Sequence, residues 1–95
     1  MATRSRAEEL LKALGNPVRL RVILALGELG EATLYRISSR TGVKRTRLRR
    51  HLETLVSSGL CLRKAHGDVL LYSLNLEDEG VRTFVEALRK ILRRP

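Results

Sequence analysis

The stretch 41–60, TGVKRTRLRRHLETLVSSGL, decides the fold of this chain. Four apolar residues in it recur at helical spacing: Leu48, Leu52, Leu55 and Val56. This spacing predicts an amphipathic helix over residues 44–58, with one apolar face that packs on the rest of the domain. Gly42 in the preceding turn can adopt the positive φ that ends a helix, and Gly59 stops the new helix. The stretch is therefore typical of the second half of a helix-turn-helix.

The other face of this helix is cationic. At about 100° per residue, Thr46 and Arg50 lie diametrically opposite the leucines. Residues 36–52 hold seven basic and no acidic side chains, whereas the flanking parts of this chain of net charge +9 are close to balanced. Such a placement is typical of a surface that binds a polyanion. A solvated basic face is the alternative, but it predicts mixed charges like those of the flanks.

These cations predict contacts to duplex DNA. The candidates for contacts to base edges are Thr46, Arg47 and Arg50, since a guanidinium matches guanine O6 and N7 with two hydrogen bonds. The candidates for phosphate contacts are Arg40, Lys44, Arg45, Arg49 and His51. A packed structural histidine is an equally good interpretation of His51.

Two local features indicate that a partner shapes this helix. Arg45 and Arg49 are like charges at i, i+4 spacing, which costs about 0.2–0.5 kcal/mol. Val43 and Lys44 offer no side-chain acceptor for the first backbone N–H groups of the helix. These N–H groups are left to a DNA phosphate or to water, and the sequence favours neither.

Five helices are predicted along the chain, over about residues 5–14, 17–26, 33–40, 44–58 and 77–95. Ser5 and Glu8 form a capping-box pattern for the first helix, and Asn16 is a good N-cap for the second. Gly27 and Gly30 are expected to end the second helix.

A β-hairpin is predicted between the last two helices. Residues 60–65 and 69–74 have strand character and flank a short turn that contains glycine. Three polar residues of the hairpin are candidates for contacts to the adjacent DNA backbone or minor groove: Arg63, Lys64 and His66. An exposed hairpin without DNA contacts is the alternative.

The order of elements is α-α-α-α-β-β-α. A mostly helical chain with a small β-hairpin wing after two helices joined by a glycine turn predicts a winged helix-turn-helix. The sequence is expected to form a single DNA-binding domain over residues 1–95, with the helix-turn-helix at 33–58 and the wing at 60–74.

The terminal segments 1–15 and 77–95 carry apolar stripes that a domain of this size does not easily cover by itself. A two-fold dimer through these helices is the preferred interpretation, and it would separate the two DNA-reading helices by roughly 34–36 Å, one DNA turn. The residues expected at the interface are Leu10, Leu14, Val81, Phe84, Val85, Leu88, Ile91 and Leu92. Packing onto the chain's own domain and a membrane-surface helix are the alternatives.

Composition narrows the remaining possibilities. No run of about 18 apolar residues exists, so no membrane span is expected. Cys61 is the single cysteine, and with His51 and His66 it does not give the ligand spacing of a metal site. We therefore expect no metal, no cofactor and no membrane partner. No nucleophile–base or carboxylate pair stands out, so an enzyme is not expected.

Residues 10–24, LLKALGNPVRLRVIL, resemble the opening of the ArsR-type winged-helix repressors, whose pattern is LGxPxRLxIL. Residues 37–43 and 50–60 are similar to the helix-turn-helix of the same family. The resemblance spans about residues 10–74 and implies a homodimeric transcriptional regulator, often a repressor, on a pseudo-palindromic operator. The family's metal-sensing cysteine pair falls where this chain reads TLYRI, residues 33–37, so the resemblance does not extend to metal sensing.

The expected function is sequence-specific binding of double-stranded DNA by a homodimeric transcriptional regulator, and the resemblance favours a repressor. The expected location is the cytoplasm, at the nucleoid. Two alternatives are a general architectural protein of the chromosome, suggested by the excess of arginine, and a winged helix that binds other proteins.

Overall fold

The computed structural model describes residues 6–93, except for the side chains of residues 6, 7, 9 and 10. The elements in chain order are α1 (Arg6–Leu14), α2 (Pro17–Leu29), β1 (Ala32–Thr33), α3 (Leu34–Thr41), α4 (Arg45–Ser57), β2 (Cys61–His66), β3 (Val69–Leu74) and α5 (Glu79–Arg93). The predicted fold class, mostly helical with a hairpin wing, is confirmed. Ser5, half of the predicted capping box, lies outside the described residues.

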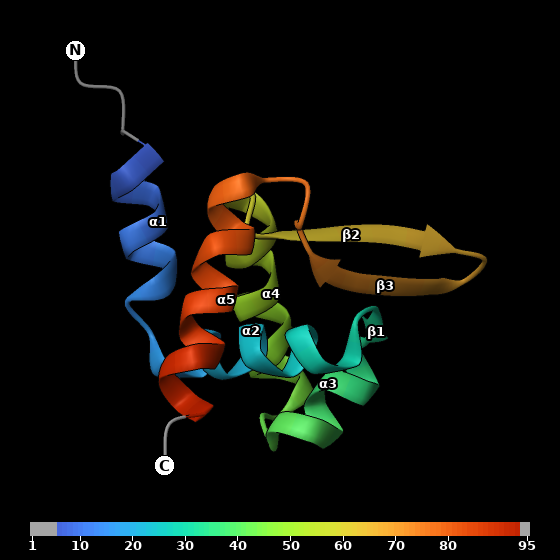
Figure 1. Ribbon diagram of the computed structural model, residues 1–95. Coiled ribbons are helices and arrows are strands. Elements are labelled where there is room, and N and C mark those ends of the chain that lie inside the picture. Colours follow the sequence, from blue (N-terminus) through green and yellow to red (C-terminus); the bar gives the residue numbers. More distant parts are fainter. Residues whose placement is uncertain (1–5, 94–95) are drawn as a thin grey trace.

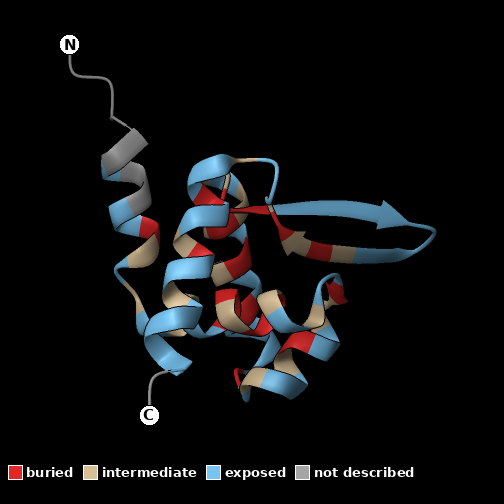
Figure 2. Cartoon of the chain, viewed as in Figure 1, coloured by how far each residue is buried: buried red, intermediate tan, exposed pale blue. Residues whose placement is uncertain are grey.

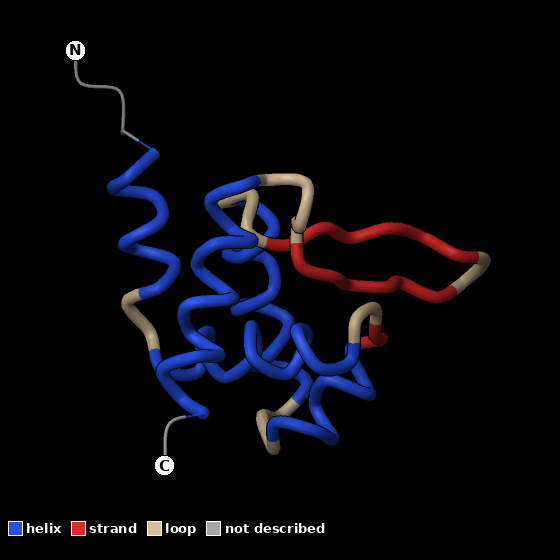
Figure 3. The backbone as a smooth tube through the Cα atoms, in the orientation of Figure 1, coloured by secondary structure: helices blue, strands red, loops and turns tan. Residues whose placement is uncertain are grey.

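The helices form one body from which the hairpin projects (Figures 1 and 3). The strands make a three-stranded antiparallel sheet in the order β1-β3-β2. Helix α5 lies against α2, and α1 leans out beside it, joined to the body at its carboxyl end. The hairpin and the amino-terminal half of α4 therefore lie away from α1.

The core is formed by the apolar faces of the helices together with the base of the hairpin (Figure 2). Its largest fully buried side chains are Ile23, Leu26, Ile37, Leu48, Leu52, Leu55, Val22 and Cys61. The predicted apolar face of the helix over 44–58 is confirmed, since its three leucines have no exposed area. Because α4 also contacts α2, α3 and β2, this face fixes its rotation about its own axis.

Local hydrogen bonds explain where the helices begin and end. Asn16 Oδ1 accepts from the backbone N–H of Val18 at 2.8 Å, as predicted for an N-cap. Asp78 Oδ1 accepts from the N–H of Gly80 at 2.9 Å and so caps α5. This helix begins at Glu79, two residues after the predicted start at residue 77. Gly42 has φ of 76° and its N–H donates to Ser38 O at 2.8 Å, which ends α3 and allows the tight turn into α4.

The prediction that Gly27 ends the second helix is wrong. Helix α2 continues through Gly27 to Leu29, and Gly30, with φ of 79°, provides the C-cap. The guanidinium of Arg89 on α5 donates to the carbonyl oxygen of Gly27, and a Cβ at residue 27 would lie 3.1 Å from Arg89 Nη2. The glycine is thus a point of close approach between two helices.

Strand β1 is a second difference, because the sequence predicts only two strands. Ala32 pairs with Tyr72 and Thr33 with Leu71. Two residues are too few to show the alternating pattern of a strand. The strand exists because β3 offers it a free edge.

Burial in the core raises the pKa of the Cys61 thiol to about 12. We predict that the native protein at pH 8 reacts with a disulfide reagent such as 5,5′-dithiobis(2-nitrobenzoate) far more slowly than glutathione does. The reaction should become rapid and stoichiometric in concentrated denaturant, because unfolding exposes the thiol and restores its ordinary pKa. Rapid labelling of the native protein, followed by absorbance, would contradict this burial.

Candidate nucleic-acid interface

We call helix α4 the reading helix. Its cationic face points to solvent because its leucines point to the core. All six candidates on its first two turns are exposed: Lys44, Arg45, Thr46, Arg47, Arg49 and Arg50. The wheel prediction that Thr46 and Arg50 lie opposite the buried leucines is therefore confirmed. This half of the helix is a dense, accessible set of donors.

The start of the reading helix has no side-chain cap, as predicted. Lys44 is the N-cap residue, with φ of −60° and ψ of 141°, and its side chain makes no capping hydrogen bond. The first N–H groups of a helix carry a partial positive charge, which favours an anion. Here they add to the charge of the arginines around them.

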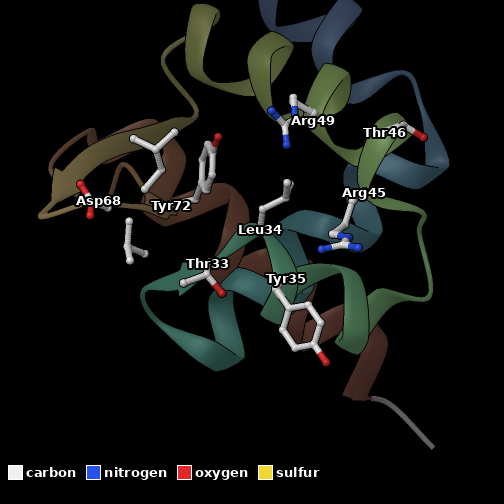
Figure 4. A pocket seen from close by; sticks show the side chains of 10 residues that line it. Thr33, Leu34, Tyr35, Arg45, Thr46, Arg49, Asp68 and Tyr72 are labelled. Atoms are coloured by element: carbon white, nitrogen blue, oxygen red, sulfur yellow. The ribbon is translucent and has the colours of Figure 1, made fainter.

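A groove of about 690 Å³ separates the reading helix from the wing (Figure 4). Its lining residues come from β1, α3, α4 and the hairpin: Thr33, Leu34, Tyr35, Arg45, Thr46, Arg49, Asp68, Val69, Leu70 and Tyr72. One wall carries Arg45 and Arg49, and the other is largely apolar apart from Asp68 at the hairpin turn. In Figure 4 the guanidinium of Arg49 points into the groove, while Thr46 points away from it.

Tyr35 is a site residue that sequence reasoning missed. It is 69% exposed on the first turn of α3, and the guanidinium carbon of Arg45 lies 5.9 Å from the centre of its ring. This cation–π contact holds the Arg45 guanidinium near the Tyr35 ring, and both side chains line the groove. An exposed aromatic residue just before the cationic segment 36–52 was the only signal in the sequence, and it is weak.

Three of the predicted DNA-contacting cations are paired with carboxylates. Arg40 pairs with Glu28, Arg63 Nη1 lies 2.5 Å from Glu53 Oε1, and Lys64 Nζ lies 3.0 Å from Glu31 Oε2. These pairs are exposed, so each contributes little to stability and can exchange partners.

The pairing has a consequence for the wing. With Arg63 and Lys64 both paired to acids and Asp68 in its turn, the wing has little uncompensated positive charge. The hydrogen bonds that the Arg63 guanidinium donates, first to Glu53 and then to Tyr72, raise its pKa. Arg63 thus ties the wing to the reading helix. His66 is exposed at the end of β2, beside the hairpin turn.

His51 lies half-buried on the side of the reading helix that faces α2. Its Nδ1 is 3.2 Å from Nη1 of Arg19. Burial first, and then the positive charges of Arg19, Arg47 and Arg50, lower the pKa of the His51 imidazole. Of the two interpretations left open by the sequence, this packed position favours the structural one.

The predicted dimer residues divide into two groups. Val81 and Val85 are 3% and 5% exposed and belong to the chain's own core, so that part of the prediction is corrected. Leu14, Phe84 and Leu88 are half-buried.

The exposed remainder lies on the two terminal helices. Ile91 and Leu92 of α5 are 64% and 59% exposed, and Leu11 of α1, which is not among the predicted interface residues, is 72% exposed. We call these three residues the terminal-helix surface. The side chain of Leu10 lies outside the described residues.

Among residues 6–93, no group of three or more His, Cys, Asp and Glu side chains is placed to hold a metal ion. Within the same residues, no helix is both long and apolar enough to cross a membrane.

Two helices joined by a glycine turn, with a cationic second helix and a hairpin after it, define a winged helix-turn-helix protein. The family described as a helix-turn-helix domain matches residues 14–64, more than half of the chain. The chain belongs to this family.

Solved structures share the fold over almost the whole chain. HlyU from Vibrio cholerae has a TM-score of 0.83 at 27% identity, covering 94% of each chain. The transcriptional repressor BigR from Xylella fastidiosa has a TM-score of 0.79 at 27% identity, covering 94% of this chain and 88% of BigR.

A third structure is the homodimeric winged helix-turn-helix DNA-binding domain Mb0332 from Mycobacterium bovis, a possible ArsR-family regulator. Its TM-score is 0.78 at 25% identity, covering 97% of this chain and 90% of that one. The resemblance to the ArsR-type winged-helix regulators is confirmed. No curated protein is a significant match in sequence.

The lowered pKa of His51 predicts a pH dependence of stability. The unfolded chain, with an ordinary pKa near 6.5, binds a proton before the folded chain does. Stability from His51 is therefore complete above pH 6.5 and is lost as the pH falls through the folded-state pKa. Urea unfolding at pH 8, 6.5 and 5 should show a smaller loss of stability for His51→Asn than for wild type. His66→Asn is the control for removing a histidine, and equal slopes in all three proteins would contradict the prediction.

Proposed function

We propose that this protein is a homodimeric transcriptional regulator that binds specific sites in double-stranded DNA and represses transcription from them. The observation that carries the proposal is the exposed cationic half of the reading helix, held outward by three buried leucines. A helix of this width with donors on its first two turns fits the major groove of B-DNA. The similarity to BigR and Mb0332 supports the regulatory role.

The proposed contacts follow from where each side chain points. Arg47, Arg50 and Thr46 lie on the outward face and read base edges. Lys44, with the uncapped N–H groups behind it, holds a phosphate.

Arg45 and Arg49 hold the sugar–phosphate strand that runs through the groove between the reading helix and the wing. The apolar wall opposite them suits the deoxyribose face of that strand. Arg40, Arg63 and Lys64 contribute by exchanging their carboxylate partners for phosphates. His51 stays behind this surface as a packing residue.

The division between base and phosphate contacts predicts two kinds of loss. Arg50→Ala should reduce discrimination between a selected duplex and a scrambled one by about 1–3 kcal/mol. Arg49→Ala should weaken binding to both duplexes alike and reduce the slope of log K against log salt by about 1. Fluorescence anisotropy over a salt series, on a duplex selected by the wild-type protein from a random pool, measures both. Unchanged discrimination in Arg50→Ala would remove it from the base-reading set.

The strand path through the groove predicts a gain of affinity. Asp68 lies on the wall opposite the arginines, where its carboxylate would repel a phosphate. Asp68→Asn should therefore raise the affinity for any duplex, about two- to fivefold at low salt. Glu86→Gln on α5 changes the net charge equally but lies outside the groove, so it should have a smaller effect. Equal gains in the two variants would show that the strand does not pass Asp68.

The proposed dimer forms through the terminal-helix surface. Leu11, Ile91 and Leu92 are large apolar side chains exposed to solvent on the terminal helices. An exposed apolar patch of this kind is typical of a protein–protein interface. A two-fold axis through α1 and α5 leaves both reading helices free on the far side. Mb0332, which has the same fold, is a homodimer.

A charge on this surface should separate the protomers. We predict that Ile91→Asp is monomeric by light scattering at micromolar concentration and loses most of its affinity for a two-half-site duplex. Thr83→Asp adds the same charge at an exposed position of α5 away from Val81 and Val85, and it should remain dimeric. A dimeric Ile91→Asp protein would exclude this surface as the interface.

A further inference from the structure

We propose that Arg19 is a positioning residue that fixes the angle between α1, on the dimer side of the molecule, and the reading helix on the DNA side. The proposal rests on the proposed function, because an angle between these helices matters only if dimer contacts place the two reading helices on one DNA. No residue role of this kind follows from the sequence pattern.

One guanidinium joins the two helices. Arg19 is in the first turn of α2, and its Nε donates to Ala13 O at 2.6 Å while its Nη2 donates to Lys12 O at 3.0 Å. Both carbonyls belong to the last turn of α1, where intrahelical donors run out. The remaining nitrogen, Nη1, lies 3.2 Å from His51 Nδ1 on the reading helix. Because the fork is planar, its three contacts fix one orientation.

Helix α1 is anchored at its carboxyl end, where Leu14 packs against the core. Ala13 is buried, but Leu11 and Lys12 are exposed, and the helix leans out from the body (Figure 1). A helix of nine residues is marginal without tertiary contacts. The chain then turns into α2 at Gly15 and Asn16. The polar contacts of Arg19 therefore lie in the same turn of α1 as Leu11 of the terminal-helix surface, so they set the direction in which this side chain faces.

The contact on the reading helix depends on the charge state of His51. Nδ1 can accept from Arg19 only when the imidazole is neutral and its proton is on Nε2. The charged groups around the ring, Arg19 from α2 and Arg47 and Arg50 from α4, are all cations, and with burial they lower the pKa of His51. The joint is therefore complete at neutral pH. Protonation in acid would replace the acceptor with a donor and open it.

A plain stabilising role for Arg19 predicts a different result from a positioning role. A residue that only stabilises the fold affects binding to one half-site and to two half-sites in proportion. A residue that sets the angle between the dimer helix and the reading helix affects the advantage of two half-sites over one. We call this advantage the bipartite ratio, the affinity for a two-half-site duplex divided by that for a single half-site duplex.

The experiment measures the bipartite ratio on duplexes derived from the site that the wild-type protein selects from a random pool. Arg19→Ala should lower the ratio at least about tenfold while changing half-site affinity less than about threefold. Arg19→Lys keeps the charge but not the planar fork, so it should lower the ratio as well. Arg21→Ala removes the same charge from an exposed position of the same helix and should leave the ratio unchanged.

A pH series adds a measurement that a purely structural role of Arg19 would leave unchanged. The wild-type ratio should fall between pH 8 and pH 5.5, as His51 gains a proton. His51→Asn keeps an acceptor near the position of Nδ1 that does not titrate, so its ratio should be close to that of wild type at pH 8 and constant with pH. Using a ratio cancels the general gain in phosphate affinity that any new positive charge brings.

The outcomes separate the two hypotheses. A wild-type protein that binds neither duplex, or that shows no advantage of two half-sites, overturns the proposed function. A wild-type protein with a clear ratio that Arg19→Ala and Arg19→Lys leave intact overturns the role of Arg19. If circular dichroism shows that Arg19→Ala is unfolded, Arg19→Lys and the pH series of His51→Asn decide, and a ratio in wild type that is flat with pH counts against the joint.

Discussion

The burial of one helix face is the constraint on which this molecule depends. Leu48, Leu52 and Leu55 are removed from solvent by α2, α3 and β2. Burying three leucines stabilises the fold by several kcal/mol, at about 1.5–3 kcal/mol each. That energy exceeds the repulsion among the arginines on the opposite face, so the helix forms with a charge density that would be unfavourable in isolation. The core thus holds the cations in place before any DNA is present.

The charges outside the reading helix have a different role. Arg40, Arg63 and Lys64 each face an acid, and Glu53 connects the wing to the reading helix through Arg63. These cations shape the surface around the reading helix more than they add to its field. Five cations lie close together at the start of α4 with no acid between them: Lys44, Arg45, Arg47, Arg49 and Arg50. A major groove admits an α-helix that carries such a surface.

In the proposed dimer, Arg19 and His51, which lie behind that patch, connect DNA binding to assembly. Winged helix-turn-helix dimers bind two half-sites only if the distance and angle between the reading helices match the DNA. In this chain one guanidinium contacts both the carboxyl end of α1 and the reading helix. In the proposed dimer, a polar joint of this kind makes the geometry sensitive to the protonation of one histidine.

The sequence by itself determined the order of the five helices and the hairpin, and the faces of the reading helix. Three kinds of signal are local: the helical spacing of apolar residues, the capping residues Asn16 and Gly42, and the concentration of cations in residues 36–52. Local patterns of this kind can be recognised in the sequence alone. The tertiary structure alone decided which cations have partners, since Glu28, Glu31 and Glu53 are distant in sequence from the residues they pair with. It also carried α2 through Gly27, added β1 at a sheet edge and placed Val81 and Val85 in the core. In each case the deciding contact joins residues far apart in the chain, and periodicity carries no information about such contacts.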